Sequence, residues 1–239
     1  MRKAGRIVAE VLEAMKELVR PGVSTKQLDE EAEKIIRSFG AEPSFKGYGG
    51  YPASICCSID DEVIHGIPSR ERILKEGQII SIDVGAYKDG YHGDAARTYG
   101  VGKISEQDEK LIKACEESFF QGLQVLKPQV YLYDVSKAIQ KSVKRSGFEV
   151  VRDYTGHGIG KQMHEDPLVP NYRPLSLSRG IRLKPGMAIA IEPMITAGSH
   201  KVITRSDGWT VVTLDGKKAA HYENSVLITE EGYEILTIL

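Results

Sequence analysis

The spacing of apolar residues predicts two helices at the start of the chain. Between residues 2 and 19, apolar side chains recur every three or four positions and so gather on one face of a helix. A Pro-Gly pair ends this run, and Ser24 and Gln27 have the spacing of a capping box that opens a second helix. Gly40 follows the last apolar position of that helix, as expected for a helix C-terminus.

A comparable pair of helices is predicted in the second half of the chain. Ser105 and Asp108 have N-cap spacing, and the apolar pattern that follows them continues as far as Leu126. A shorter helix is predicted at about 134–145. Each half thus consists of two helices followed by strands. This order indicates the α+β class, with helices covering one face of a mostly antiparallel sheet.

Two strand signals end in the same way, each with a carboxylate. The phrase ILKEGQIISID closes at Asp83, and the phrase RLKPGMAIAIE closes at Glu192. Each phrase contains Leu-Lys, a glycine turn and then an apolar run of strand length. We therefore expect both acids at the ends of buried strands, where a carboxylate is costly unless it is paired.

The repeat extends to both sides of these phrases. His65 and His157 each open a His-Gly-Ile triplet upstream. Asp94 and Glu223 each close a His-x-acid triplet downstream. The His-Gly-Ile triplet and the acid of the repeated phrase lie further apart in the second half than in the first. The extra residues include a proline-rich segment, 160–180, which we expect to be a loop. Matched elements in the same order indicate two halves that direct acids at one shared point.

Length and composition set mild limits. The 239 residues fit one domain, 1–239, built from pseudo-symmetric halves of about 1–100 and 101–239. The 32 basic and 33 acidic residues nearly cancel, so bulk charge favours neither nucleic acid nor an anionic membrane as a partner. No apolar run has the length of a membrane span, and the charged N-terminus is unlike a signal peptide. Three cysteines without metal-binding spacing indicate a reducing compartment, so we expect a cytoplasmic protein.

The acids of the repeat are candidate metal ligands: Asp83, Asp94, Glu192 and Glu223. Four converging carboxylates repel one another unless cations neutralise them. Two divalent ions, bridged by shared carboxylates at about 3.5–4 Å from each other, do this. Oxygen ligands with one imidazole suit Mn²⁺, Fe²⁺, Co²⁺ or Zn²⁺. Such a pair of ions holds a nucleophilic hydroxide and polarises a carbonyl, so the predicted reaction is a hydrolysis.

Four motifs carry a resemblance to a known family: DVGAYKDGYHGDAART, TGHGIGKQMHE, IAIEPMI and HYENSVLIT. They resemble the motif set of the type I methionine aminopeptidases, which have the pita-bread metallopeptidase fold. The resemblance covers essentially the whole chain. It implies that the protein removes the N-terminal methionine from nascent proteins whose second residue is small. The implied substrates are nascent chains associated with ribosomes. Independently of the resemblance, we expect a monomer, because each half of the chain is complete only with its partner half.

The resemblance assigns roles to the metal ligands. It implies that Asp83 and Asp94 bind one ion, and that the other ion is held by Asp94, His157, Glu192 and Glu223. Asp94 and Glu223 bridge the two ions. Glu192 doubles as the general base for the attacking water.

The resemblance also assigns residues to the substrate. His65 and His164 match two histidines that are not ligands, one contacting the scissile amide nitrogen and the other the carbonyl oxygen. The family's methionine pocket maps onto Phe45, Tyr48, Tyr51, Cys56, Met163 and Trp209, which together with the two histidines form the predicted substrate site. Phe45 and Met163 depart from many members, which have a small residue and an aromatic there. The exchange roughly conserves volume, so we expect methionine selectivity to persist.

Taken singly, most of these residues have an ordinary structural interpretation. An acid such as Asp83 beside a strand is usually a turn former or a cap. Lone histidines such as His65 and His164 are more often structural, and only the motif context assigns them to catalysis. His92 and His221 repeat as well, and we interpret them as structural because the family does not use them as ligands.

Two other functions stay open at this point. One is a proline-directed or creatinase-like enzyme of the same fold, although such relatives usually carry a sizeable N-terminal domain for which this chain has no room. The other is a non-catalytic pita-bread binding module, although such proteins tend to lose the metal ligands that are all present here. Metal content and the cleavage of Met-Ala-Ser, Met-Lys-Ser and Ala-Pro-Ala separate the three functions.

Overall fold

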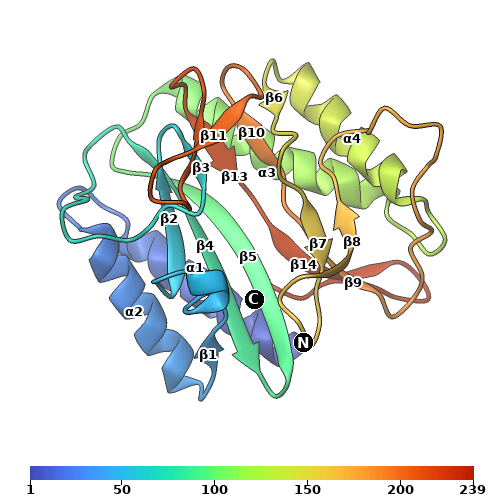
Figure 1. The fold of residues 1–239 in the computed structure, drawn as a ribbon, viewed down its shortest axis with the longest axis horizontal. Helices are drawn as coiled ribbons and strands as arrows, with labels where there is room; N and C mark the ends of the chain where they lie inside the picture. The colour runs from blue at the N-terminus through green and yellow to red at the C-terminus, as the bar shows by residue number, and fades with distance from the viewer.

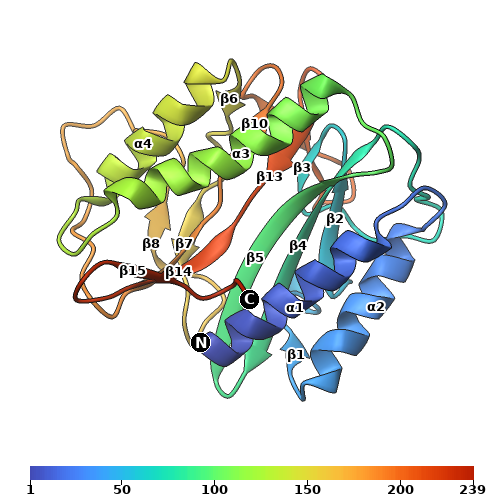
Figure 2. The same cartoon turned by 180° about the vertical axis from the view of Figure 1, so that it is seen from behind.

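The computed structural model describes residues 1–239, and four helices lie on one side of its strands (Figures 1 and 2). The helices are α1 (Arg2–Leu18), α2 (Thr25–Ser38), α3 (Glu106–Val125) and α4 (Leu132–Arg145). The predicted capping box at Ser24 is confirmed, and Ser105 accepts a hydrogen bond from the backbone N–H of Asp108. Helix α4 starts earlier than predicted, because Asp134 occupies its first turn, where a carboxylate is favourable, instead of its N-cap.

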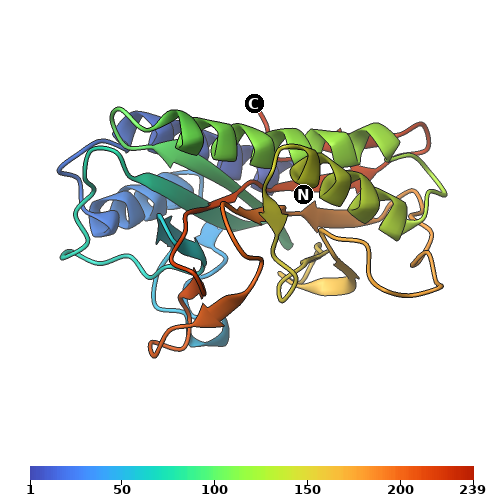
Figure 3. The same cartoon turned by 90° about the horizontal axis from the view of Figure 1, so that it is seen from above.

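The strands are short except for one long hairpin. They are β1 (Glu42–Pro43), β2 (Ile55–Ile59), β3 (Glu62–Ile64), β4 (Ile79–Lys88), β5 (Tyr91–Gly100), β6 (Glu149–Val150), β7 (Gly156–Gly158), β8 (Glu165–Val169), β9 (Ala188–Ile191), β10 (Met194–Thr196), β11 (Val202–Thr204), β12 (Val211–Thr213), β13 (Ala219–His221), β14 (Asn224–Ile228) and β15 (Tyr233–Ile235), with a 3₁₀ turn at Tyr48–Gly50. All pairings are antiparallel. The α+β prediction, with helices on one face, is therefore confirmed (Figure 3).

The strands form four small sheets. Strand β4 pairs with β1, β2 and β5, and a second sheet has the order β15-β14-β9-β7-β8. The other two have the orders β13-β10-β6 and β11-β12-β3. The last of these joins β3 of the first half to a hairpin of the second. No helix has the length and apolar character needed to cross a bilayer.

The two repeated phrases do not end in the same way. Strand β9 stops at Ile191, so Glu192 follows its end as predicted, and Pro193 supplies no N–H to continue the ladder. Strand β4 continues past Asp83 to Lys88, so the prediction of a strand end at Asp83 is wrong. The reason is the hairpin, because β5 pairs with β4 along its whole length and keeps it extended.

The segment 160–180 was expected to be a loop, and this is wrong for part of it. Strand β8 lies within it and pairs with β7. The prolines therefore flank or occupy an edge strand, where a missing N–H is tolerated.

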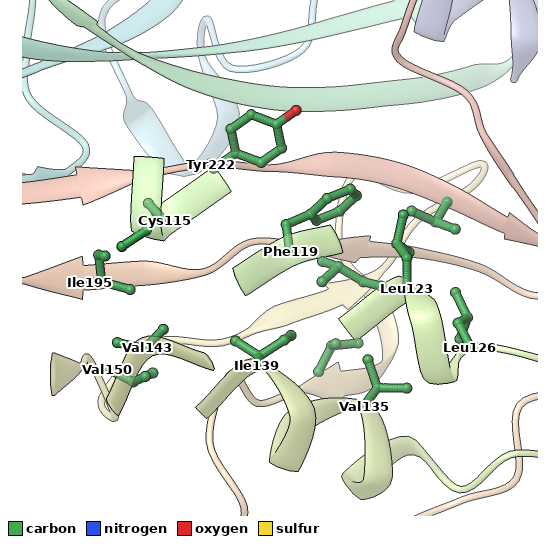
Figure 4. Packing of buried hydrophobic residues seen from close by; sticks show 14 of the residues in the cluster. Cys115, Phe119, Leu123, Leu126, Val135, Ile139, Val143, Val150, Ile195 and Tyr222 are labelled. Atoms are coloured by element: carbon green, nitrogen blue, oxygen red, sulfur yellow. The ribbon is translucent and has the colours of Figure 1, made fainter. Parts of the chain in front are cut away.

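Each half has its own hydrophobic core beneath its helix pair. Helices α1 and α2 pack on β4 and β5 around residues such as Met15 and Ile82. Figure 4 shows the second core, in which Phe119 of α3 and Ile139 of α4 face the strands. Burying a large side chain of this kind contributes roughly 1.5–3 kcal/mol. The helices thus pack on one face of the sheets and do not cover the opposite face.

A seam of hydrogen bonds joins the halves along β5. The backbone N–H of Glu223 donates to the carbonyl of Ala96 at 3.0 Å. Two residues before Ala96, the backbone N–H of Asp94 donates to Ser225 Oγ at 3.0 Å. Arg97 donates to Asn224 Oδ1 at 2.7 Å across the same seam. These contacts place Asp94 of one half beside Glu223 of the other.

Candidate metal centre and substrate pocket

All the predicted site residues line one cavity of about 180 Å³, and none of its lining residues belongs to an α-helix. Its lining consists of the predicted ligands, the two predicted catalytic histidines and the predicted pocket residues, together with Gly49: Phe45, Tyr48, Gly49, Tyr51, Cys56, His65, Asp83, Asp94, His157, Met163, His164, Glu192, Trp209 and Glu223. The structure therefore brings together residues from both halves that are far apart in the chain.

The acids reach the cavity from two strands of each half. Asp83 lies on β4 opposite Ala96, and Asp94 lies on β5 opposite Gly85, so the two acids occupy diagonal positions on one face of the hairpin. Glu192 follows β9, and Glu223 precedes β14, which is paired with β9. The register of the β4–β5 pair and the pairing of β9 with β14 thus bring two acids from each half to the same cavity.

The four carboxyl groups are in an environment that disfavours their charge. Burial raises the pKa of Asp83 to about 7. Burial, followed by repulsion from neighbouring carboxylates, raises the pKa values of Asp94, Glu192 and Glu223 well above their usual range. Lysine and arginine side chains form no ion pair with any of the four. Cations bound among these oxygens would supply the missing charge.

His157 presents a lone pair to the acids. Its Nδ1 lies 2.8 Å from the carbonyl of Gly158, which can only accept, so Nδ1 carries the proton and Nε2 is free. Nε2 lies 3.8 Å from Asp94 Oδ2 and 3.7 Å from Glu192 Oε1. Burial, reinforced by His164, lowers the pKa of His157 to about 4, which leaves a neutral imidazole, the form that binds metals.

The glycines on either side of His157 are required by packing. Strand β7 lies between β9 and β8. A Cβ on Gly156 would lie 2.2 Å from the carbonyl oxygen of Ala190, and a Cβ on Gly158 would lie 2.2 Å from that of Asp166. Only glycine allows these backbones to approach, which fixes His157 in the middle of the sheet.

The two other histidines of the cavity stand at the mouth of the metal centre. His65 has a positive φ of 59°, an uncommon conformation that directs the chain past the pocket. Burial, reinforced by His164, lowers the pKa of His65 to about 4, and burial also lowers the pKa of His164. His164 Nδ1 lies 2.8 Å from the hydroxyl of Tyr48, and its ring centroid lies 4.2 Å from that of His157.

An apolar wall completes the cavity opposite the acids. It belongs to a cluster of five buried residues, all of which except Ala53 line the cavity: Phe45, Tyr51, Ala53, Cys56 and Met163. Trp209 packs against this group, with its ring 5.1 Å from that of Tyr51 in an edge-to-face arrangement. The hydroxyl of Tyr51 lies 3.1 Å from the carbonyl oxygen of Ile55 and 3.0 Å from that of Gly66, so its single proton has a backbone acceptor. The wall therefore offers one apolar side chain a place next to the carboxylates.

Comparison with known proteins places this site in a family. A model of metallopeptidase family M24 matches residues 1–230. The chain is 55% identical over 237 residues to methionine aminopeptidase 1 of Bacillus subtilis, covering 99% of this chain and 94% of that one. It is 56% identical over 239 residues to the methionine aminopeptidase of Clostridium acetobutylicum, covering 100% and 94%. The chain belongs to the methionine aminopeptidases of metallopeptidase family M24.

Solved structures agree with this assignment. The crystal structure of the methionine aminopeptidase of Thermotoga maritima matches with a TM-score of 0.96 at 44% identity, and covers 100% of this chain and 95% of that chain. The predicted resemblance, the pita-bread fold and the class of metallopeptidase hydrolase are thereby confirmed. Membership of this family implies a divalent metal centre.

Two features of this methionine aminopeptidase were missed by sequence reasoning. Gly49 lines the cavity, but a glycine in a polar turn carries no distinguishing signal. His221 was interpreted as structural, yet its Nε2 lies 3.7 Å from Glu192 Oε2 and 3.8 Å from Glu223 Oε2. The signal for His221 in the sequence was the repeat, because His92 and His221 each stand two residues before a predicted ligand. Burial lowers the pKa of His221 to about 3.

A second, larger cavity of about 490 Å³ is lined by residues of α1, α3 and β5 and by the C-terminal residues. Its lining includes His221 and the C-terminal Leu239 but none of the four site carboxylates. Its two acids, Glu13 and Glu116, are not among the clustered groups that could hold a metal ion. His221 contributes to the wall between this cavity and the acids.

Proposed function

We propose that this protein removes the N-terminal methionine from peptides whose second residue is small, using two divalent ions. The observation that carries the proposal is that the lining of one cavity combines four carboxylates and a neutral imidazole with an apolar wall. A free amino terminus next to the acids and an apolar side chain against the wall describe an aminopeptidase substrate.

The residues present fit divalent ions. Buried oxygens of Asp83, Asp94 and Glu223 have no hydrogen-bond partner, although buried polar atoms are normally satisfied. The Nε2 of His157 is turned toward the same point. Asp83 and Asp94 would hold one ion, and Asp94, His157, Glu192 and Glu223 the other. The donor set suits Mn²⁺, Fe²⁺, Co²⁺ or Zn²⁺. When bound, the ions would activate water and polarise the scissile carbonyl.

Glu192 is the proposed general base. It directly follows β9 and lines the cavity, with Oε1 3.7 Å from Nε2 of His157 and Oε2 3.7 Å from Nε2 of His221. Accepting the proton of the attacking water and passing it to the leaving amine is the role that this position allows.

His65 and His164 are the proposed substrate contacts. Burial lowers the pKa values of both, which favours the neutral imidazole, with one N–H to donate and one nitrogen to accept. One would contact the scissile amide nitrogen, and the other would donate to the carbonyl oxygen as negative charge develops on it. The hydrogen bond with Tyr48 holds the ring of His164 in place.

The apolar wall is the proposed methionine pocket. Phe45 and Met163 are both buried there, so the exchange that departs from many relatives keeps the wall closed. A thioether contacts aromatic rings and another Met side chain favourably. The small volume of the whole cavity, about 180 Å³, favours a single residue ahead of the scissile bond.

A three-peptide assay with elemental analysis tests the proposal. Protein purified without added metal should contain divalent metal, cleave Met-Ala-Ser and leave Met-Lys-Ser and Ala-Pro-Ala intact. Cleavage of Ala-Pro-Ala instead would assign a proline-directed peptidase. Metal binding without any cleavage would assign a binding module.

The proposal includes the setting of the reaction. The physiological substrates are nascent chains at ribosomes in the cytoplasm, and the enzyme acts as a monomer because the two halves of one chain complete the site. Analytical ultracentrifugation and co-sedimentation with translating ribosomes test these points. A dimer, or no enrichment with translating ribosomes, would contradict them.

A further inference from the structure

His221 is the buried group next to the metal centre to which the proposed function gives no role. Its ring is 2% exposed, and Nε2 has no hydrogen-bond partner. The backbone of residue 221 is fixed twice, because its N–H donates to Thr98 Oγ1 at 2.9 Å and its carbonyl accepts from the same hydroxyl at 2.9 Å. A polar atom that is both buried and unpartnered, on a backbone so firmly held, needs an explanation.

Two proposed ligands each place a carboxylate oxygen close to this nitrogen. Nε2 lies 3.7 Å from Glu192 Oε2 and 3.8 Å from Glu223 Oε2. The other oxygen of Glu192, Oε1, lies 3.7 Å from Nε2 of His157. Glu192 therefore has an imidazole on each of its two oxygens, one from β7 and one from β13.

The two imidazoles differ in which nitrogen is held by the protein. The proton of His157 is fixed on Nδ1 by the carbonyl of Gly158. No hydrogen bond holds a proton on Nδ1 of His221 in this way. A lone pair on its Nε2 would face two carboxylate oxygens that also carry lone pairs, whereas an N–H would face two acceptors. The tautomer with the proton on Nε2 is therefore favoured.

We infer that His221 is a positioning residue, whose Nε2–H donates to Glu192 and Glu223 and orients them toward the metal ions. The inference rests on the proposed dinuclear function. Ligating carboxylates are commonly held by hydrogen bonds from residues behind them. His221 would fix the rotamers of the general base and of one bridging acid at once.

The pseudo-symmetric histidine shows that the repeat does not require this arrangement. His92 precedes Asp94 as His221 precedes Glu223. Its Nδ1 lies 2.8 Å from Ser44 Oγ, and its ring packs on Tyr87 at 4.7 Å. The Nδ1 atom of His92 thus has its hydrogen-bond partner outside the metal centre. His92 therefore provides a matched control for His221.

The first test is the affinity for Zn²⁺ of His221→Phe, His221→Gln and the controls His92→Phe and His92→Gln, measured by calorimetry. His221→Phe keeps a planar ring without a donor and should bind the more weakly held ion about 10–100-fold less tightly. His221→Gln restores an N–H and should recover most of the affinity, and the His92 variants should bind as the unaltered protein does. Equal affinity in His221→Phe and the unaltered protein would overturn the inference.

The second test is ¹⁵N NMR of the imidazoles in the zinc-loaded, otherwise unaltered protein. A proton bonded to Nε2 of His221 supports the inference, and it decides the question even if His221→Phe does not fold. An unprotonated Nε2 bound to zinc would overturn it, because the nearest atoms of Asp83, His221 and Glu223 lie within 4.8 Å of one another and could share an ion. If the unaltered protein binds no zinc at all, the proposed function fails instead.

Discussion

The Nε2 atom of His157 lies 3.7 Å from Oε1 of Glu192, and it does so because Gly158 holds the opposite nitrogen of the ring at 2.8 Å. A backbone carbonyl thus decides which face of the imidazole is presented to the acids. The other oxygen of Glu192, Oε2, lies 3.7 Å from Nε2 of His221, so the carboxylate stands between two imidazoles. His157 and Glu192 therefore place a proposed metal ligand directly beside the proposed general base.

Removing the charge of Glu192 should stop turnover. Glu192→Gln keeps the shape of the side chain but cannot accept a proton, so kcat for Met-Ala-Ser should fall by about 10²–10⁴-fold. Metal content is measured alongside to separate the loss of a ligand from the loss of the base. Glu116→Gln removes a carboxylate from the second, larger cavity and should leave kcat unchanged. Substantial activity in Glu192→Gln would refute its role as the base.

The metal-free protein should lose stability as the pH rises. The pKa of Asp83 is raised to about 7 from a usual 3.8, so the folded state holds its proton more tightly than the unfolded chain. That stabilisation is complete below about pH 4 and is lost as the pH rises to about 7. With divalent metal bound, the trend should reverse, because the ligands must be deprotonated. Melting temperatures with chelator and with Mn²⁺ across this range measure both slopes, and parallel slopes would contradict the prediction.

Trp209 should matter for substrate binding more than for folding. Its ring covers the apolar wall, and Trp209→Ala removes contact area worth about 1–2 kcal/mol, or about 5–30-fold in KM for methionine-initiated peptides. Tyr91→Ala, at the tip of the β4–β5 hairpin, is the control for loss of a partly exposed aromatic. An unchanged KM in Trp209→Ala would remove this residue from the pocket.

The hydroxyl of Tyr48 should act through His164. Tyr48→Phe keeps the ring but loses the 2.8 Å contact with Nδ1, and a hydrogen bond of about 0.5–1.5 kcal/mol corresponds to about 2–10-fold in kcat. Tyr51→Phe is the comparison, because that hydroxyl binds backbone carbonyls and its loss should lower the melting temperature instead. Steady-state kinetics and thermal denaturation of both variants separate the roles. Equal kcat in Tyr48→Phe and the unaltered enzyme would exclude the orienting contact.

The sequence by itself specified the helix pairs and the set of site residues. Capping residues such as Ser24 act on the next few backbone N–H groups, so their effect is local and can be recognised in the sequence. The repeated acids were visible because a repeat marks equivalent positions of two halves, whatever their distance in space. The family motifs added the roles, since they fix residue types in a known context.

Only the tertiary structure decided how those residues meet. Strand β4 runs past Asp83 because β5 pairs with it, and such pairing depends on residues that no local pattern links. The seam between Ala96 and Glu223 then sets the two halves in register. His92 and His221 stand at equivalent places in the sequence, yet one turns toward Ser44 and the other toward the acids. A sequence repeat specifies position along the chain, but side-chain direction is decided by long-range packing.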